Sequence, residues 1–158
     1  MRNMILLTGA FALLFAACKS DTASNLKPLD LMKYGIPLTV LAPDSAKVET
    51  MDLIVQNDVT IKKGDDFFIQ LYASDASTTD IKKVKADQLE EVKANPYFSG
   101  IVSEDDNGFV YKKQVDSTNV NYGFKYIKIQ GDKEYIFQTG LIGKFSEESV
   151  MAMYNAVK

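Results

Sequence analysis

The sequence predicts an α+β fold in which helices cover both faces of a mostly antiparallel sheet, as in an α/β/α sandwich. The first observation is a strand-like segment that is apolar on both sides: Phe67, Ile69 and Leu71 would face one way, and Phe68 and Tyr72 the other. The second is the presence of two segments with helical periodicity. One follows this strand and one ends the chain, so each can cover one face of the sheet.

The chain opens with the pattern of a secretory signal. Arg2 precedes an apolar run that ends at Phe15, and the small residues Ala16 and Ala17 follow. The apolar run is shorter than the roughly 18 residues that a membrane-spanning helix needs. Cys18, the only cysteine, comes next. The motif "FAAC" resembles the lipobox of bacterial lipoproteins, with Phe15 where leucine is usual.

This resemblance implies that Cys18 carries diacylglycerol through a thioether, becomes the new N-terminus and anchors the protein to a membrane. The alternative is a chance cysteine after an ordinary signal peptide. We therefore expect residues 1–17 to be a lipoprotein signal peptide. Residues 18–27 are mostly polar and predict a lipid-anchored flexible tether, and residues 28–158 predict one α+β domain.

The net charge of the chain limits the classes of partner that it can bind. Outside the leader, 17 lysines face 21 acidic residues and no arginine is present. A mildly acidic domain of this kind lacks the basic surface of nucleic-acid-binding proteins. Without arginine, it also lacks bidentate recognition of phosphate or carboxylate. We therefore expect no nucleic acid among its partners.

The N-terminal half predicts a short helix and then strands. Pro28 suits a first helical turn and Gly35 suits the position after a helix, so a helix is expected over 28–34. Alternating and β-branched residues then predict strands, with turns at Asn57-Asp58 and Gly64. These strands are expected within 36–43, 46–55, 58–66 and 67–74.

The C-terminal half predicts a long helix, two hairpins and a closing helix. Ser77 and Asp80 have the spacing of a capping box, and Asn95-Pro96 would end the helix, which is expected over 78–94. Asn107-Gly108 is a strong hairpin turn, and Gly131-Asp132 predicts a second one. Ser146 is the expected N-cap of the last helix.

This element order resembles the PsbP-like family over about residues 35–158. Two stretches carry the resemblance: "YGIPLTVLAPDSAKVE" as an entry strand ending in proline, and "FSEESVMAMYNAVK" as a closing helix preceded by an aromatic residue. It implies the same α/β/α sandwich and a binding or assembly role. No diagnostic site motif of the family is matched, so the resemblance implies no functional residue.

Residue types set limits on catalysis. The chain has no histidine, the usual general base near neutral pH, and no glycine-rich phosphate loop. Asp65 and Asp66 would face apart on a strand. The acidic cluster Glu104–Asp106 beside Asn107-Gly108 could belong to a calcium loop that starts at Ser103. Its twelfth position would then be Gln114 instead of glutamate, and a hairpin turn explains the cluster better. We therefore predict no catalytic residue, no cofactor and no metal site.

These observations predict a non-enzymatic, lipid-anchored lipoprotein of the cell envelope with a binding or assembly role for a protein partner. Two alternatives stay open: a carrier of an apolar or lipid-like ligand held between sheet and helix, and a carboxylate-dependent hydrolase. Exposed aromatic residues at Tyr97 and Phe98, or a basic patch at Lys82, Lys83 and Lys85, could form a binding surface, although core packing and solvation explain them more simply. Lys19 follows the lipid site, which favours the outer membrane.

Overall fold

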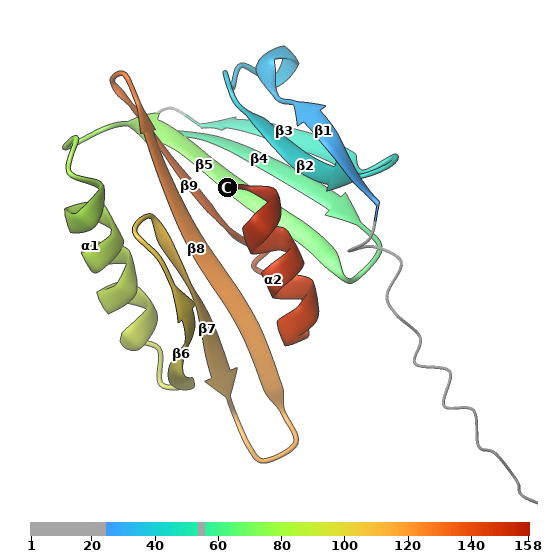
Figure 1. Cartoon of the computed structure of the whole chain (residues 1–158), viewed down its shortest axis with the longest axis vertical. Helices are drawn as coiled ribbons and strands as arrows, with labels where there is room; N and C mark the ends of the chain where they lie inside the picture. Colours follow the sequence, from blue (N-terminus) through green and yellow to red (C-terminus); the bar gives the residue numbers. More distant parts are fainter. Residues whose placement is uncertain (1–24, 54–55) are drawn as a thin grey trace, which may run out of the picture.

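A computed structural model describes residues 25–53 and 56–158. Its main element is a seven-stranded antiparallel sheet with the order β3-β4-β5-β9-β8-β7-β6 (Figure 1). The strands are β3 (Lys47–Leu53), β4 (Gln56–Lys63), β5 (Phe67–Asp75), β6 (Phe98–Glu104), β7 (Gly108–Gln114), β8 (Val120–Gln130) and β9 (Lys133–Thr139). The predicted signal peptide, Cys18 and most of the predicted tether lie outside the described residues.

A second, two-stranded sheet precedes the main one. It consists of β1 (Leu26–Asp30) and β2 (Thr39–Pro43), joined through the 3-10 helix η1 (Met32–Tyr34). The prediction of a helix over 28–34 is therefore wrong. Pro28 is tolerated because a strand with a single neighbour has backbone groups that need no partner in the sheet. β1 also starts at Leu26, inside the segment expected to be tether.

Two helices complete the described chain. They are α1 (Ile81–Lys93) and α2 (Glu147–Ala156). α1 begins after Asp80, whose carboxylate accepts hydrogen bonds from the N–H groups of Lys82 and Lys83, so the predicted start at residue 78 is three residues early. Ser146 caps α2 as predicted, by accepting a hydrogen bond from the N–H of Ser149.

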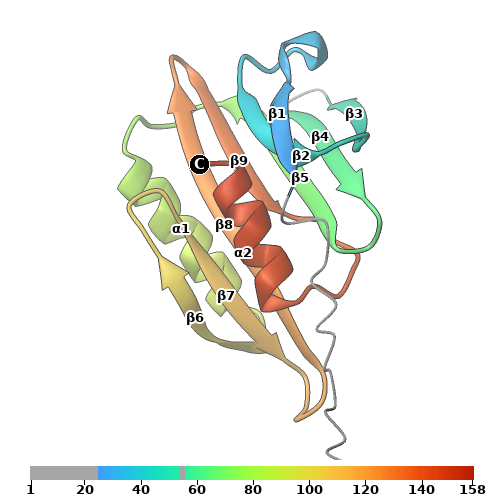
Figure 2. The same cartoon turned by 45° about the vertical axis from the view of Figure 1, so that its right-hand side comes forward.

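The main core lies between one face of the large sheet and a cover formed by α2 and the β1–β2 sheet. Figure 2 shows α2 running along the front of the sheet, beside β1 and β2. Tyr154 of α2 is fully buried and makes edge-to-face contacts with Phe124 and Tyr126 of β8, at centroid distances of 5.9 and 5.7 Å. Such contacts add to the burial of apolar surface in fixing the helix on the sheet.

The predicted α+β sandwich, with helices covering both faces, is wrong: the described chain is mostly β. The second face carries only α1, which covers its β6–β8 end through a small cluster that contains Val92, Phe109 and Tyr111. The prediction required a full cover because Phe68 and Tyr72 are aromatic. Both are only partly buried in the structure, and apolar atoms contribute a large share of the accessible surface of any folded protein, so the rings need no full cover.

The turns were predicted with mixed success. The hairpins β6–β7 and β8–β9 lie where Asn107-Gly108 and Gly131-Asp132 indicated. The turn expected at Asn57-Asp58 is wrong, because both residues pair with β5 inside β4. β9 ends at Thr139, so the apolar residues Leu141 and Ile142 that follow it do not belong to the sheet.

Gly108, at the start of β7, is expected to be intolerant of any side chain. A Cβ atom there would lie 2.5 Å from the backbone oxygen of Lys125, and neither backbone can give way without disturbing the β7–β8 ladder. Gly108→Ala should therefore lower the free energy of unfolding by about 1–3 kcal/mol. Urea titration measures this. An unchanged urea midpoint and slope would contradict this prediction, because it would show that β7 and β8 accommodate the Cβ atom without a loss of stability.

Tyr154 should make the protein sensitive to alkali. Burial of the phenol, and then the nearby Asp105 carboxylate, raise the pKa of Tyr154 above its usual value of 10. Above pH 10 the unfolded chain loses this proton while the folded chain keeps it, so stability falls as pH rises. The loss is about 1.4 kcal/mol per pH unit for one such group.

Tyr154→Phe should remove that part of the alkaline loss. From pH 7 to 9 we expect a constant difference in unfolding free energy between the variant and the natural chain. Between pH 10 and 11 the natural chain should lose more stability than the variant. Urea titrations at these pH values give the comparison. Parallel curves throughout would mean that the phenol ionises equally easily in both states.

Candidate functional site

The open face of the large sheet, beyond the reach of α1, is the most distinctive surface of the described chain. Figure 2 shows α2 in front of the sheet and α1 behind it, close to β6 and β7. The face that α1 shares therefore continues uncovered across β9, β5, β4 and β3. Successive residues of a strand point to opposite faces of the sheet. A residue therefore points to the open face when the residues before and after it point into the core beneath α2.

One continuous row of polar residues crosses this face. The strand register places Glu49 opposite Thr60, Thr60 opposite Gln70, Gln70 opposite Gln138, and Gln138 opposite Lys125. We call these five residues the polar row. Five adjacent strands, β3, β4, β5, β9 and β8, each contribute one member. The next position after Lys125 is Phe109, which lies in the cluster beneath α1.

The three innermost residues of the polar row are buried although they are polar. Gln70, Gln138 and Lys125 are 7%, 6% and 7% exposed. The amide of Gln70 donates to a carboxylate oxygen of Asp58 at 2.8 Å, and the amide of Gln138 donates to the side-chain oxygen of Gln70 at 3.5 Å. Burying amides is costly unless they are hydrogen-bonded, so this chain of contacts holds the row in one arrangement.

At its inner end the polar row enters a depression of about 210 Å³ beside α1. Lys125 and Glu91 of α1 both line it, with 3.7 Å between the ammonium nitrogen and the nearer carboxylate oxygen. Burial lowers the pKa of Lys125, and the Glu91 carboxylate opposes this shift only in part. A buried ammonium with one distant partner retains donors that can bind a carbonyl or carboxylate.

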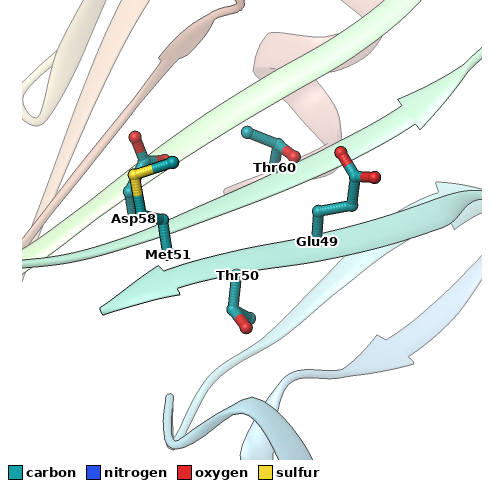
Figure 3. Close-up of a pocket in the computed structure, with 5 residues that line it drawn as sticks. All are labelled: Glu49, Thr50, Met51, Asp58 and Thr60. Atoms are coloured by element: carbon teal, nitrogen blue, oxygen red, sulfur yellow. The ribbon is translucent and has the colours of Figure 1, made fainter. Parts of the chain in front are cut away.

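At its outer end the polar row lies on an exposed and shallow surface. Figure 3 shows Glu49, Met51, Asp58 and Thr60 on one side of strands β3 and β4, and Thr50 on the opposite side. The second carboxylate oxygen of Asp58 is buried without a hydrogen-bond partner among the described residues. One acceptor at this end is therefore left without a hydrogen bond from the described residues.

Tyr72 borders the row on β5, directly opposite Asp58. Burial raises the pKa of the Tyr72 phenol, and the charge of Asp58 raises it further, while a hydrogen bond with Gln70 acts in the opposite direction. The phenol therefore stays protonated near neutral pH and can donate a hydrogen bond. The surface around the polar row thus combines amide, hydroxyl, ammonium and carboxylate groups.

The carboxylates singled out from the sequence do not form a site in the structure. Asp105 accepts hydrogen bonds from the N–H groups of Asn107 and Gly108, which forms the predicted hairpin turn, and it pairs with Lys158 at 2.8 Å. Asp65 and Asp66 are exposed in the β4–β5 turn. Over residues 25–53 and 56–158, no three histidine, cysteine or acidic residues are grouped as a metal site requires.

The basic and aromatic candidates are also separated by the structure. Lys83 pairs with Asp87 and Lys85 with Glu104, at 2.8 and 2.9 Å, so acidic partners offset the charge of two of the three lysines at the start of α1. Phe98 packs against the cluster beneath α1, whereas Tyr97 is 49% exposed. Sequence reasoning missed the polar row. Its one sequence signal was a glutamine inside each of two apolar strands, "FFIQLY" and "YIFQT".

Comparisons with known proteins give no relative for this chain: no family model, no curated protein and no solved structure matches it. The resemblances to bacterial lipoproteins and to the PsbP-like family therefore stay predictions. Among the described residues, no helix is long and apolar enough to cross a membrane.

Proposed function

We propose that this protein is a lipid-anchored binding protein of the cell envelope whose polar row receives a polar segment of a protein partner. Cys18 would carry the lipid, and Lys19 after it favours the outer membrane. The observation that carries the binding role is the burial of Gln70, Gln138 and Lys125 on a sheet face that the described helices leave largely open. Replacing buried charged groups by well-packed apolar ones is often neutral or stabilising, so folding alone does not explain them.

The dimensions of the polar row favour an extended peptide. Neighbouring strands lie about 4.8 Å apart, so the row from Glu49 to Lys125 spans about 19 Å. An extended chain rises about 3.3 Å per residue, so about six residues would follow the row. Gln70 and Gln138 could then bond its backbone N–H and C=O groups, and Lys125 could bond an acceptor at the end beside α1.

A carrier of an apolar ligand is not proposed further. Under that alternative the ligand would lie between the sheet and a helix. In the structure this space is occupied by fully buried side chains of α2 and the sheet, among them Met153, Tyr154 and Phe137. A hydrolase is not proposed either, because the carboxylate of Asp58 is held by Gln70 and that of Glu49 by Lys47.

Site-specific photo-crosslinking in cells tests the proposed function. A benzophenone amino acid in place of Met51 would stand on the open face, whereas the same amino acid in place of Thr50 would stand on the other side of the same strand (Figure 3). We expect a defined crosslinked envelope protein from position 51 only. Gln138→Leu, which removes the amide between Gln70 and Lys125, should reduce that product strongly. Equal crosslinking from positions 50 and 51 would contradict the proposal.

A further inference from the structure

The loop between β9 and α2 presents two large apolar side chains to solvent. Leu141 and Ile142 are 77% and 84% exposed. Hydrogen bonds hold both ends of this loop: the N–H of Gly140 donates to a carbonyl of β5 at 2.8 Å, and the amide of Asn121 donates to the carbonyl of Gly143 at 3.1 Å. The fold therefore supports these two side chains in an exposed position.

Two further apolar side chains lie beside this loop. Tyr97 and Val115, 49% and 54% exposed, line one depression, and Leu141 lines the adjacent one. Asn95 and Lys113 form part of the wall of both depressions, which makes them neighbours. We call the four exposed apolar residues the apolar rim: Tyr97, Val115, Leu141 and Ile142. Exposed apolar side chains gathered at one place indicate a contact surface more than scattered ones do.

The described chain starts at the same end of the large sheet as the apolar rim. Leu26 lies opposite Pro43, which leads into the turn before β3, and Lys47 of β3 lies opposite Lys62 at the end of β4. The following β4–β5 turn leads to the start of β5, to which Gly140 is hydrogen-bonded. The N-terminal segment therefore attaches at the end where the β9–α2 loop lies.

The segment between the predicted lipid site and the domain is short. Seven Cα–Cα steps separate Cys18 from Asn25, which limits the reach of this segment to about 25 Å. We propose that the apolar rim contacts the lipid surface to which Cys18 is anchored, so that the domain stands on this end and presents the polar row to the side. This inference rests on the anchor that forms part of the proposed function.

The charged residues around the apolar rim indicate how the rim contacts the lipid surface. Lys113 and Lys144 lie at the rim, but so do Asp116 and, at the start of α2, Glu147. Mixed charge gives no strong attraction to anionic headgroups. Insertion of the apolar side chains at the boundary between headgroups and acyl chains therefore carries the contact, as in interfacial membrane proteins.

Depth-dependent fluorescence of the lipidated full-length protein tests this contact. Cys18 is the only cysteine, and a thioether-linked lipid leaves it without a free thiol, so Ile142→Cys creates one site for an environment-sensitive dye. Asp132→Cys, in the β8–β9 turn at the opposite end of the sheet, is the matched control. Both proteins are reconstituted into phosphatidylethanolamine and phosphatidylglycerol vesicles, with and without nitroxide-labelled lipid.

We expect dye at position 142 to emit at shorter wavelength in vesicles and to be quenched about twofold or more by the nitroxide lipid, because it lies at the headgroup boundary. Dye at position 132 should do neither. Water-like emission at position 142 in acylated, vesicle-bound protein would overturn the rim contact and leave the anchor intact. A blue shift without quenching would mean that another copy of the protein covers the rim, and would also overturn the contact. An unacylated Cys18, seen as a mass without lipid and a second labelled thiol, would overturn the anchor and this inference with it.

Discussion

Cys18→Ala is expected to move the protein from the membrane fraction to the soluble fraction of the cell envelope. Two or three acyl chains on Cys18 would anchor the protein stably, whereas a single chain binds membranes only marginally. Without a thiol no lipid can be attached, and the apolar rim alone is too small to hold the domain on a bilayer. Fractionation followed by immunoblotting measures the distribution, and labelled palmitate measures the modification.

Ser20→Ala, two residues beyond the predicted lipid site, provides the control for this variant. It alters the tether without removing the thiol, so it should keep both the label and the membrane association. Folding of the Cys18→Ala protein should be unchanged, because the described domain begins at Asn25. Equal incorporation of palmitate into the natural chain and the Cys18→Ala variant would refute the lipoprotein hypothesis.

Phe124→Ala is expected to have the largest effect on stability among substitutions of the core. Phe124 is fully buried in β8 and contacts the ring of Tyr154, which fixes α2 to the sheet. Removing the ring should lower the free energy of unfolding by about 3–5 kcal/mol, through lost transfer free energy and the cavity left behind. This is a large fraction of the roughly 5–15 kcal/mol that typical domains have.

Ile142→Ala is the matched comparison for a large apolar residue outside the core. Its side chain is 84% exposed, so the unfolding free energy should change by less than about 0.5 kcal/mol. Urea titration of both variants gives the contrast. A loss below about 1 kcal/mol for Phe124→Ala would mean that α2 contributes little to the stability of the sheet.

Local signals predicted the fold well where a single residue type determines the backbone. The Asn107-Gly108 turn and the Ser146 cap act over a few residues, so distant parts of the chain cannot override them. Pro28 shows the opposite case: its ring suits a first helical turn or an edge strand equally, and pairing with β2 decided for the strand.

The candidate site was much less predictable. The glutamines at positions 70 and 138 could be seen inside apolar strands, but they are 68 residues apart in the chain. Only the insertion of β9 next to β5 places them opposite each other. The same holds for Lys125 and Glu91, which meet because α1 lies over β8. Long-range pairing of this kind leaves no periodic signal in the sequence.

The sequence by itself determined the strand and helix segments of the C-terminal half, the lack of histidine and of a phosphate loop, and the lipobox-like motif at Cys18. The tertiary structure alone decided which sheet face is covered. Alternation of apolar and polar residues shows that the two faces of a strand differ, but it does not show which element packs on each face. Here α2 and the β1–β2 sheet cover one face, while the single helix α1 is too short to cover the other. The polar row lies on that face, and no described helix covers its outer end at Glu49 and Thr60 for this reason.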